Sequence, residues 1–316
     1  MKSVAIIQGR MSSKRLPGKI LIDIEGSPLL AHVIHRAEAA NIFDAVIFAT
    51  STDKEDDPVA EYCATNGKEC FRGDLNDVLE RYYQAAQTYK ADMITRLTAD
   101  CPLLDPAVIR QVVEVFDPTR FKSPCYLDTG TDFIDGMPRV CSTEGMKQTR
   151  EAVGLAGPAA GAQPPREGWV RGRDTVGGHP TLRHDYVSNA IQRTYPDGLD
   201  TEVFSMAALT RARNEARLPS EREHVTPYIH RHPELFRIGH VTQEHDLSAL
   251  RWTVDEPRDL AFVRAIFAEL GDGVFGQEEV LALLARKPEL QTMNEGIVCN
   301  EGYKKSLSED PALPPS

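Results

Sequence analysis

Apolar and polar positions follow two different periods along the first third of the chain. Short apolar runs rich in β-branched residues predict buried strands at 3–8, 44–50 and 92–98, and a brief strand near Cys70 and Phe71. Apolar residues spaced by three and four predict helices between these strands, at 27–40, 56–67, 76–89 and 105–116. Because strands and helices alternate in this order, the sequence predicts an α/β fold with a Rossmann-like, mainly parallel sheet flanked by helices.

The pattern fails between 122 and 182, where Gly, Pro and Ala accumulate without a lasting period. We interpret this segment as an insertion, either a surface excursion or a mobile lid over a site. Strands are again predicted at 200–205 and 250–254, and helices at 206–216, at 220–236 with a break at Pro227, at 256–270 and at 276–290. The sequence thus predicts one domain formed by 1–120 and 183–290, followed by a poorly ordered polar tail at 291–316.

The charge balance narrows the classes of partner. The chain has 36 Lys and Arg residues against 47 Asp and Glu residues, a net charge of −11. This balance argues against nucleic acid and membrane surfaces as partners, because both favour a basic face. The six cysteines include no CxxC pair, so we expect ordinary reduced thiols. No apolar run reaches the ~20 residues of a transmembrane helix and no signal peptide is recognisable, so the predicted location is cytoplasmic.

One short stretch departs from the acidic average. No acidic residue precedes Asp23, yet the loop after the first strand carries four cationic side chains: Arg10, Lys14, Arg15 and Lys19. A loop in this place offers free backbone N–H groups, and Arg and Lys add bidentate and point-charge contacts. Together these features favour a polyphosphate ligand. The alternative is a solvated basic loop, which is the usual fate of a charge run.

The two common glycine-rich phosphate loops do not fit this stretch. Walker A needs four residues between its glycines, whereas eight separate Gly9 from Gly18, and Ile20 follows Lys19. The G-x-G-x-x-G dinucleotide fingerprint does not match either. Three residues are nevertheless small enough to let a phosphate approach the backbone: Ser12, Ser13 and Gly18.

The stretch GRMSSKRLPGK resembles the signature of the cytidylyltransferases that activate sugar acids. These are the acylneuraminate and KDO cytidylyltransferases, and the resemblance is strongest to their spore-coat-polysaccharide branch. Further stretches resemble that branch in the same order: ATSTDKEDDPVAEYC, FRGDLNDVLERYYQAA, TRLTADCPLLDP, YPDGLDTEVFS, PSEREHVTPYI and LRWTVDEPRDLAFVRAIF. The resemblance covers about 1–120 and 183–306. It implies a sheet of the nucleotide-diphospho-sugar transferase type with a small inserted acceptor or dimerisation subdomain, and a homodimer.

The resemblance also implies an activity: transfer of CMP from CTP to a small anionic acceptor, a sugar acid as first choice, with Mg²⁺ as cofactor and release of pyrophosphate. Arg10 and Lys19 would stabilise the transition state. Asp100 and Asp255 match the metal-binding aspartates, Asp100 being a catalytic residue as well; the alternative for each is a helix N-cap. The signature loop would hold the triphosphate through Gly9, Arg10, Ser12, Ser13, Arg15 and Lys19.

Two further groups of residues match the family near the nucleoside and the acceptor. Arg72 and Asp77 are candidates for base or ribose contacts, although Asp74, Asn76 or Asp77 is equally suited to cap the following helix. Arg222 would bind an acceptor carboxylate or phosphate, and His224 would orient or deprotonate an acceptor hydroxyl. The acceptor-binding candidates are Asp197, Asp200, Glu221, Arg222 and His224. The alternative is a Pro-Asp-Gly turn followed by a solvated helix start.

Two departures from the family and three rival functions complete the expectations. Gly9 stands where the family usually has Ala, which should only loosen the loop, and Ala99 stands where Gly is common, a small change beside Asp100.

The first rival function is that of a glycosyltransferase of GT-A type. Such an enzyme often has an Asp-x-Asp motif, whereas a single Asp100 follows the strand here. The other rivals are CMP transfer to a phosphorylated or phosphonate acceptor, and a non-catalytic nucleotide-binding regulator.

Overall fold

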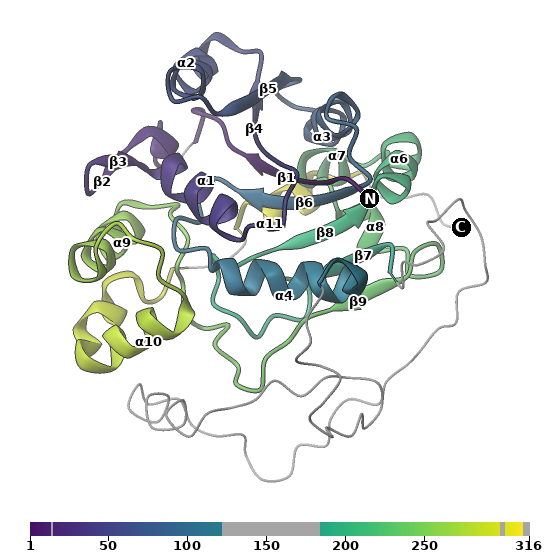
Figure 1. Ribbon diagram of the computed structural model, residues 1–316. Coiled ribbons are helices and arrows are strands. Elements are labelled where there is room, and N and C mark those ends of the chain that lie inside the picture. Colours follow the sequence, from purple (N-terminus) through teal and green to yellow (C-terminus); the bar gives the residue numbers. More distant parts are fainter. Residues whose placement is uncertain (14, 122–183, 298–300, 312–316) are drawn as a thin grey trace.

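The structure is a computed structural model that describes residues 1–13, 15–121, 184–297 and 301–311. A seven-stranded sheet lies at its centre, in the order β5-β4-β1-β6-β8-β7-β9 (Figure 1). β1 runs parallel to β4 and β6, and β4 to β5, whereas β8 runs antiparallel to β6 and β7. The strands are β1 (Ser3–Gln8), β4 (Ala45–Ser51), β5 (Glu69–Gly73), β6 (Met93–Thr98), β7 (Tyr186–Ser188), β8 (Glu202–Ser205) and β9 (Ile238–His240). The predicted mainly parallel sheet is confirmed.

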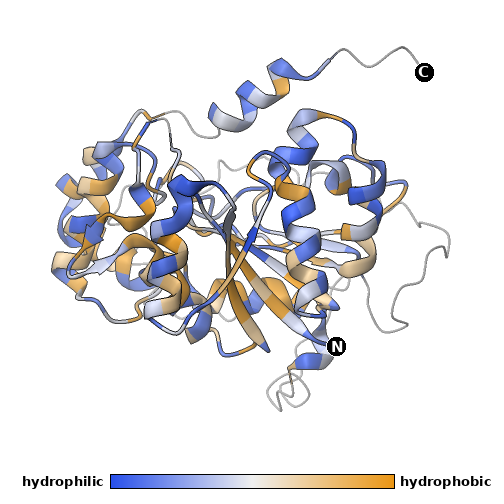
Figure 2. Cartoon of the chain, turned by 90° about the horizontal axis from the view of Figure 1, so that it is seen from above, coloured by the Kyte–Doolittle hydropathy of each residue, from blue (hydrophilic) through white to orange (hydrophobic). Residues whose placement is uncertain are grey.

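Helices cover both faces of this sheet, so the described chain forms three layers. One core lies under α1 (Leu29–Ala39), α2 (Asp57–Thr65), α4 (Pro106–Phe116), α9 (Pro257–Leu270) and α10 (Gln277–Arg286). The other lies under α3 (Val78–Thr88), α6 (Met206–Glu215) and α8 (Pro227–His230). Ile7 belongs to the first core and Ile6 to the second, as the alternation of strand residues requires. Figure 2 shows the apolar strands between the two groups of helices.

Several short elements connect these layers. α1 begins at Leu29 rather than at the predicted Ser27, because Ser27 and Pro28 form the second strand of a small hairpin. The hairpin strands are β2 (Asp23–Ile24) and β3 (Ser27–Pro28). The remaining helices are α7 (Pro219–His224), α11 (Glu301–Glu309) and the 3-10 turns Lys19–Leu21, Lys54–Asp56, Pro118–Arg120 and Pro288–Asn294. The predicted break at Pro227 is confirmed, since α8 begins there after α7 has ended at His224.

The parallel register brings the loops of the predicted site together. Gln8 at the end of β1 pairs with Ala49 of β4 and with Thr98 of β6. The loop that follows β1 therefore leaves the same edge as the loop that follows β6, and Ala99 N donates to Gln8 O at 2.8 Å. Ligands of such sheets bind at the carboxyl ends of the strands, so this edge is where a site is expected.

The predicted strand at 250–254 is wrong. Arg251 instead forms an isolated bridge with Asp197, and Trp252 N donates to Asp197 O at 2.6 Å. The turn that contains Asp197 packs so closely that a Cβ on Gly198, whose φ is +117°, would lie 2.6 Å from the Trp252 carbonyl carbon. The segment is thus paired with a turn rather than with the sheet, whose last strand is the unpredicted β9.

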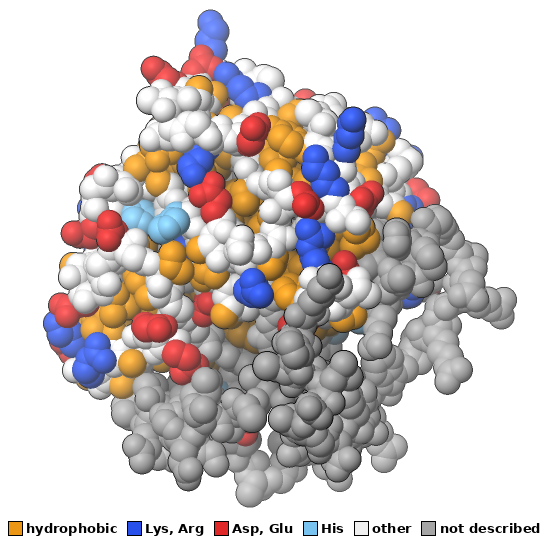
Figure 3. All heavy atoms as spheres, in the orientation of Figure 1, with side chains coloured by type: hydrophobic (Ala, Val, Ile, Leu, Met, Phe, Trp, Pro, Cys, Tyr) orange, Lys and Arg blue, Asp and Glu red, His pale blue; other side chains and the backbone are white. Residues whose placement is uncertain are grey.

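The tail also differs from its prediction, since α11 forms within it and packs against α7. The insertion at 122–182, the proposed inserted subdomain and Lys14 lie outside the described residues. Cys63, Cys70 and Cys101 are free thiols, as expected. None of the described helices is long and apolar enough to cross a membrane. On the face shown in Figure 3, Lys and Arg side chains are interspersed with Asp and Glu.

Candidate active site

Lys19 joins the two predicted metal-binding aspartates. Its Nζ lies 2.9 Å from Asp100 Oδ2, 2.8 Å from Asp255 Oδ1 and 2.8 Å from the carbonyl oxygen of Val254. These three acceptors use all three ammonium hydrogens, and Lys19 is 8% exposed. Three side chains from distant parts of the sequence therefore meet at the carboxyl edge of the sheet.

The ion pairs stabilise the charged forms at this point. Burial alone would lower the pKa of Lys19, but Asp100 and Asp255 raise it above its usual value. Burial would likewise raise the pKa of Asp100, but Lys19 lowers it to about 2. The N-cap alternative for both aspartates is wrong, because Asp105 caps α4 and Glu256 precedes α9 as its N-cap.

Asp255 is held by three cations. Besides Lys19, Arg15 Nη2 and Arg251 Nη2 each lie 2.9 Å from Asp255 Oδ2. Arg251 is itself fixed by the fully buried Asp259, at 2.9 Å, and its pKa is raised by Asp259 and Asp255 although burial opposes this. Arg251 is a residue of the site that the sequence does not indicate, because the pattern of LRWTVDEP predicts a strand at this position.

The cationic loop is anchored at a second buried acid. Asp56, which is 1% exposed, accepts from Met11 N at 2.7 Å and from Ser51 N at 3.1 Å, so it ties the loop to the end of β4. Within the loop, Met11 O accepts from Ser13 N at 2.8 Å and from Gly18 N at 2.9 Å. Ser12 is exposed at its surface.

The loop cations have acidic partners from elsewhere in the chain. Arg15 lies 3.1 Å from Glu301 of α11, and Arg10 lies 3.8 Å from Glu223 of α7. Acidic residues are thus distant from the loop in the sequence but lie next to it in the fold. The expectation that Gly9 loosens the loop is also wrong, because a Cβ there would meet Ala99 Cβ at 2.6 Å.

The candidates for nucleoside contacts make structural contacts of their own. Asp77 caps α3 by accepting from Glu80 N at 2.9 Å, and its second oxygen accepts from Arg222 Nε at 3.1 Å. The predicted nucleoside and acceptor residues Asp77 and Arg222 are therefore one ion pair. Arg72 donates to Ser51 O and Asp53 O, both at 2.8 Å.

Three of the predicted acceptor residues serve mainly to hold the fold. Asp200 forms a bidentate pair with Arg193, at 2.7 Å for both bonds, and Asp197 lies 3.1 Å from Arg251. Glu221 is 5% exposed and caps α7 by accepting from Leu218 N at 3.0 Å. Of the other two candidates, Arg222 is paired with Asp77, and His224 directly follows Glu223, the ion-pair partner of the loop cation Arg10.

His224 lies beside a second charged group that the sequence did not reveal. Arg96 on β6 forms an ion pair with Glu202 on β8, whose carboxylate also accepts from Tyr186 Oη at 2.6 Å. Burial and the charge of Arg96 lower the pKa of His224, so its imidazole is neutral at neutral pH. Arg96 lies two residues before Thr98 on β6, so the two side chains are on the same face of the sheet. This alternation is the signal from which a role for Arg96 could have been predicted.

The two aspartates fit the Mg²⁺ that the resemblance implies. Both bind one ammonium nitrogen, so they already share a cation, and hard carboxylate oxygens are what Mg²⁺ takes from proteins. Asp255 has both oxygens paired with cations, whereas within the described part of the chain Asp100 is paired with the cation of Lys19 alone, so Asp100 is the more available ligand. No cluster of three or more metal-binding side chains occurs among the described residues. In proteins Mg²⁺ usually takes one or two carboxylates and keeps waters and substrate phosphates as its other ligands.

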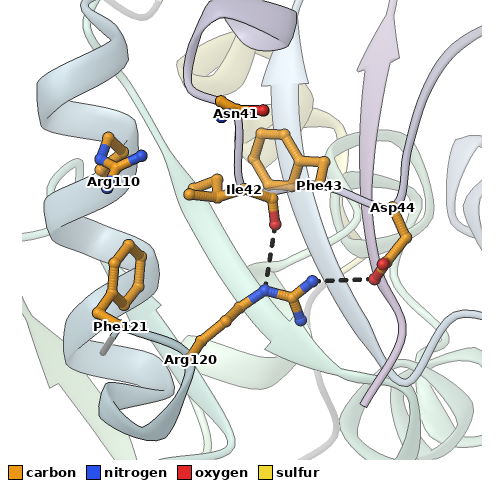
Figure 4. Close-up of a pocket in the computed structure, with 7 residues that line it drawn as sticks. All are labelled: Asn41, Ile42, Phe43, Asp44, Arg110, Arg120 and Phe121. Carbon is orange, nitrogen blue, oxygen red and sulfur yellow. Dashed lines mark hydrogen bonds and ion pairs between the residues drawn. The ribbon is translucent and has the colours of Figure 1, made fainter. Parts of the chain in front are cut away.

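A pocket of about 550 Å³ lies at the opposite end of the sheet (Figure 4). Arg120 spans it, donating to Ile42 O at 3.1 Å and to Asp44 Oδ2 at 2.9 Å. Asp44 directly precedes β4, so the pocket lies at the amino ends of the strands and is separate from the site. Its lining residues are Asn41, Ile42, Phe43, Asp44, Arg110, Arg120 and Phe121.

Fold and site together define a class of protein. A helix-flanked, mainly parallel sheet carries a cationic loop after its first strand and two aspartates that share a cation at the same edge. Polyphosphate chemistry needs this combination, because it depends on positioning and charge neutralisation. The chain is a nucleotidyltransferase.

Known proteins narrow the class to a family. The sequence model of a family described as cytidylyltransferase matches residues 4–156. The spore coat polysaccharide biosynthesis protein SpsF of Bacillus subtilis (strain 168) is 26% identical over 298 residues, which cover 92% of this chain and 97% of that protein. The 3-deoxy-manno-octulosonate cytidylyltransferase of Yersinia pseudotuberculosis serotype O:1b (strain IP 31758) is 39% identical over 118 residues, 36% of this chain and 46% of that protein.

A solved structure agrees over almost the full length. A cytidylyltransferase from Leptospira borgpetersenii serovar Hardjo-bovis (strain JB197) superposes with a TM-score of 0.70 at 26% identity, covering 94% of this chain and 99% of that chain. Residues 4–156 match the cytidylyltransferase family, relatives of that family are similar to the chain over most of its length, and the resemblance seen in the sequence is confirmed.

Proposed function

We propose that the protein transfers CMP from CTP to a hydroxyl group of a sugar acid and releases pyrophosphate, in the synthesis of a surface polysaccharide. The observation that carries the proposal is the junction of Lys19, Asp100 and Asp255 beside the cationic loop. The family match and the names of the relatives from Bacillus and Yersinia support the nucleotide, the acceptor class and the pathway class.

The reaction assigns a role to each group. The acceptor oxygen bonds to the α-phosphorus of CTP, the bond from that phosphorus to the β-phosphate bridging oxygen breaks, and pyrophosphate leaves with the electron pair. His224 takes the acceptor proton, and Arg10 and Arg15 neutralise the phosphates. Mg²⁺ held by Asp100 and Asp255 would add to this neutralisation.

Lys19 needs a change of partners in this scheme. Its ammonium is saturated by Asp100, Asp255 and Val254 O, so it reaches a phosphate only by leaving at least one of them. Removing a charge-stabilising group of this kind costs roughly 3–4 kcal/mol in barrier. Lys19 is therefore proposed as a transition-state group that exchanges between carboxylate and phosphate.

A pyrophosphate-release assay tests the proposal. CTP, ATP, GTP and UTP are each combined with 3-deoxy-manno-octulosonate, an N-acylneuraminate, a phosphonate and a neutral hexose, with and without Mg²⁺. We expect release with CTP, a sugar acid and Mg²⁺, loss of turnover but intact folding in Asp100→Asn, and no change in the exposed control Asp272→Asn. Turnover by Asp100→Asn would refute the role of Asp100 as a metal ligand. Pyrophosphate release with the phosphonate and with none of the other acceptors would identify a phosphonate, rather than a sugar acid, as the acceptor.

The rival functions give different results. A GT-A glycosyltransferase would release a nucleoside diphosphate from a nucleotide sugar, and a regulator would bind CTP without releasing pyrophosphate. The family match favours nucleotidyl transfer over both. The homodimer and the cytoplasmic location stay predictions, and sedimentation of the full chain would test the first.

A further inference from the structure

The C-terminal helix α11 reaches His224, the residue proposed to take the acceptor proton. Ser306 of α11 is 5% exposed, and its Oγ lies 3.0 Å from His224 Nε2. The same Oγ lies 2.7 Å from Glu223 Oε2 and 3.1 Å from Gly302 O. One buried hydroxyl thus connects the helix to both the imidazole and the neighbouring carboxylate.

The partners of Ser306 decide where the imidazole proton lies. A hydroxyl has one hydrogen to donate, and both a carboxylate and a carbonyl oxygen can only accept. Glu223 is the charged acceptor and, at 2.7 Å, the nearest of the three partners, so it takes the Ser306 hydrogen, and Oγ faces His224 with a lone pair. His224 Nε2 must then carry the hydrogen and donate, which leaves the lone pair of the neutral ring on Nδ1.

Further contacts hold the ring in this orientation. Tyr303 of α11 packs edge-on against it, with ring centroids 5.0 Å apart and planes at 82°. The Tyr303 hydroxyl accepts from Arg231 Nη2 at 2.7 Å. The His224 side chain keeps 25% of its surface exposed although Ser306 covers its Nε2 edge.

The charges around the ring keep it neutral. Burial lowers the pKa of His224, and so do Arg96 on β6 and Arg10 in the loop, while Glu223 and Glu202 oppose them. A neutral ring carries a single N–H, so the position of that hydrogen determines which nitrogen is basic.

We propose that Ser306 is a positioning residue for this reaction: together with Glu223 it holds the His224 proton on Nε2, so that Nδ1 receives the proton of the acceptor hydroxyl. The inference rests on the proposed function, since it names the basic atom of the same site. As the acceptor oxygen bonds to the α-phosphorus, its hydrogen moves to Nδ1 and the ring becomes doubly protonated. Pyrophosphate leaves with the electrons of the broken phosphorus–oxygen bond.

Nitrogen NMR of the full chain tests the proton position without any turnover. With ¹⁵N-labelled histidine, the His224 signals among the nine histidines are assigned by their loss in His224→Gln. We expect the Nε2–H tautomer in the unsubstituted protein, a shift toward the other tautomer in Ser306→Ala, and the original signals in Ser306→Thr. An Nδ1–H tautomer in the unsubstituted protein overturns the inference.

Kinetics supply the second readout. Ser306→Ala should lower kcat about tenfold, the effect of one charge-supporting hydrogen bond, with KM for CTP unchanged and the acidic limb of the pH profile displaced. His224→Gln should lose about 100-fold or more. Ser308→Ala is the matched control, because Ser308 is an exposed residue of the same helix whose hydroxyl donates to Lys305 O at 2.7 Å.

The two proposals fail in distinguishable ways. If no acceptor supports pyrophosphate release but His224 has the Nε2–H tautomer, the proposed function falls and the proton assignment stands. If release occurs and Ser306→Ala changes neither kcat nor the tautomer, the role of Ser306 is refuted while the proposed function stands.

Discussion

Moving one methyl group between neighbouring strands tests how tightly the two loops of the site are packed. Gly9 follows β1 and Ala99 follows β6, and a Cβ built on Gly9 would lie 2.6 Å from Ala99 Cβ and 2.8 Å from Phe48 Cζ. The family that the sequence resembles usually has Ala at the first position and commonly Gly at the second. The two departures thus amount to one exchange of a methyl group across a single contact.

The structure gives the size of the effect. Carbon atoms in contact are about 3.5–4.0 Å apart, so Gly9→Ala overlaps Ala99 by about 1 Å and should cost about 1–3 kcal/mol of unfolding free energy. Ala99→Gly removes a methyl group that is 1% exposed and should cost about 1 kcal/mol or more. The double substitution removes the overlap with Ala99 and keeps the overlap with Phe48. It should therefore be more stable than the sum of the single changes predicts, by about 1 kcal/mol or more.

Urea unfolding of the four proteins measures this coupling as a double-mutant cycle. Gly273→Ala is the matched control, because a Cβ on Gly273 has nothing within 4 Å, and it should change stability by less than about 0.5 kcal/mol. Pyrophosphate release should follow the same order, since Asp100 directly follows Ala99. A coupling below about 0.5 kcal/mol would mean that the two positions do not share one space, and the packing account would be wrong.

Three further predictions concern the charges of the site. Lys19→Ala should weaken binding of CTP more than binding of CMP, because its ammonium is proposed to reach the leaving group; equal losses in calorimetry would remove that role. Burial raises the pKa of Asp100 but Lys19 lowers it from 3.8 to about 2, so this stabilisation is present above about pH 4 and is lost as the pH falls toward 2. As the pH falls from about 4 to 2, the free energy of unfolding of Asp100→Asn should therefore decrease less than that of the unsubstituted protein. If the two proteins lose stability in parallel over this range, the ion pair between Lys19 and Asp100 does not contribute as described. Glu301→Gln frees Arg15 of an exposed acid at 3.1 Å and should tighten CTP binding by up to about fivefold; weaker binding would show that Glu301 supports the site.

The meeting of Asp100 and Asp255 could be predicted from the sequence because it depends on topology. Each aspartate was expected to follow a strand, and segments that end at one edge of a sheet lie close together whatever their separation in sequence. The prediction succeeded although 250–254 is not a strand, since Val254 N donates to Asp100 O at 2.8 Å. A hydrogen bond to the loop after β6 replaces the expected strand pairing and brings Asp255 to the same place.

The partners of the loop cations could not be predicted in the same way. Their acids come from α7 and α11, through Glu223 and Glu301, and neither periodicity nor local charge indicates that these helices pack beside the loop. Glu221 is a case in which the family match predicts a role that the packing does not favour. The match predicts contact with the acceptor, but the carboxylate of Glu221 caps α7. A motif fixes which residues are present, whereas packing decides which of their polar atoms are already bonded.

The distribution of these acids bears on how an acidic protein binds a polyanion. Each described cation of the loop has a carboxylate partner: Glu223 for Arg10, Glu301 and Asp255 for Arg15, and Asp100 and Asp255 for Lys19. Binding of a triphosphate is then an exchange of anionic partners, and its free energy is a difference between two sets of ion pairs. The buried pairs of Lys19 are screened little by salt, and the more exposed pairs of Arg10 and Arg15 are screened more. The outer cations therefore release their carboxylates at low cost, whereas Lys19 changes partners only when another cation, such as the proposed Mg²⁺, or a proton compensates Asp100 and Asp255. This requirement couples nucleotide binding to the charge state of the two aspartates.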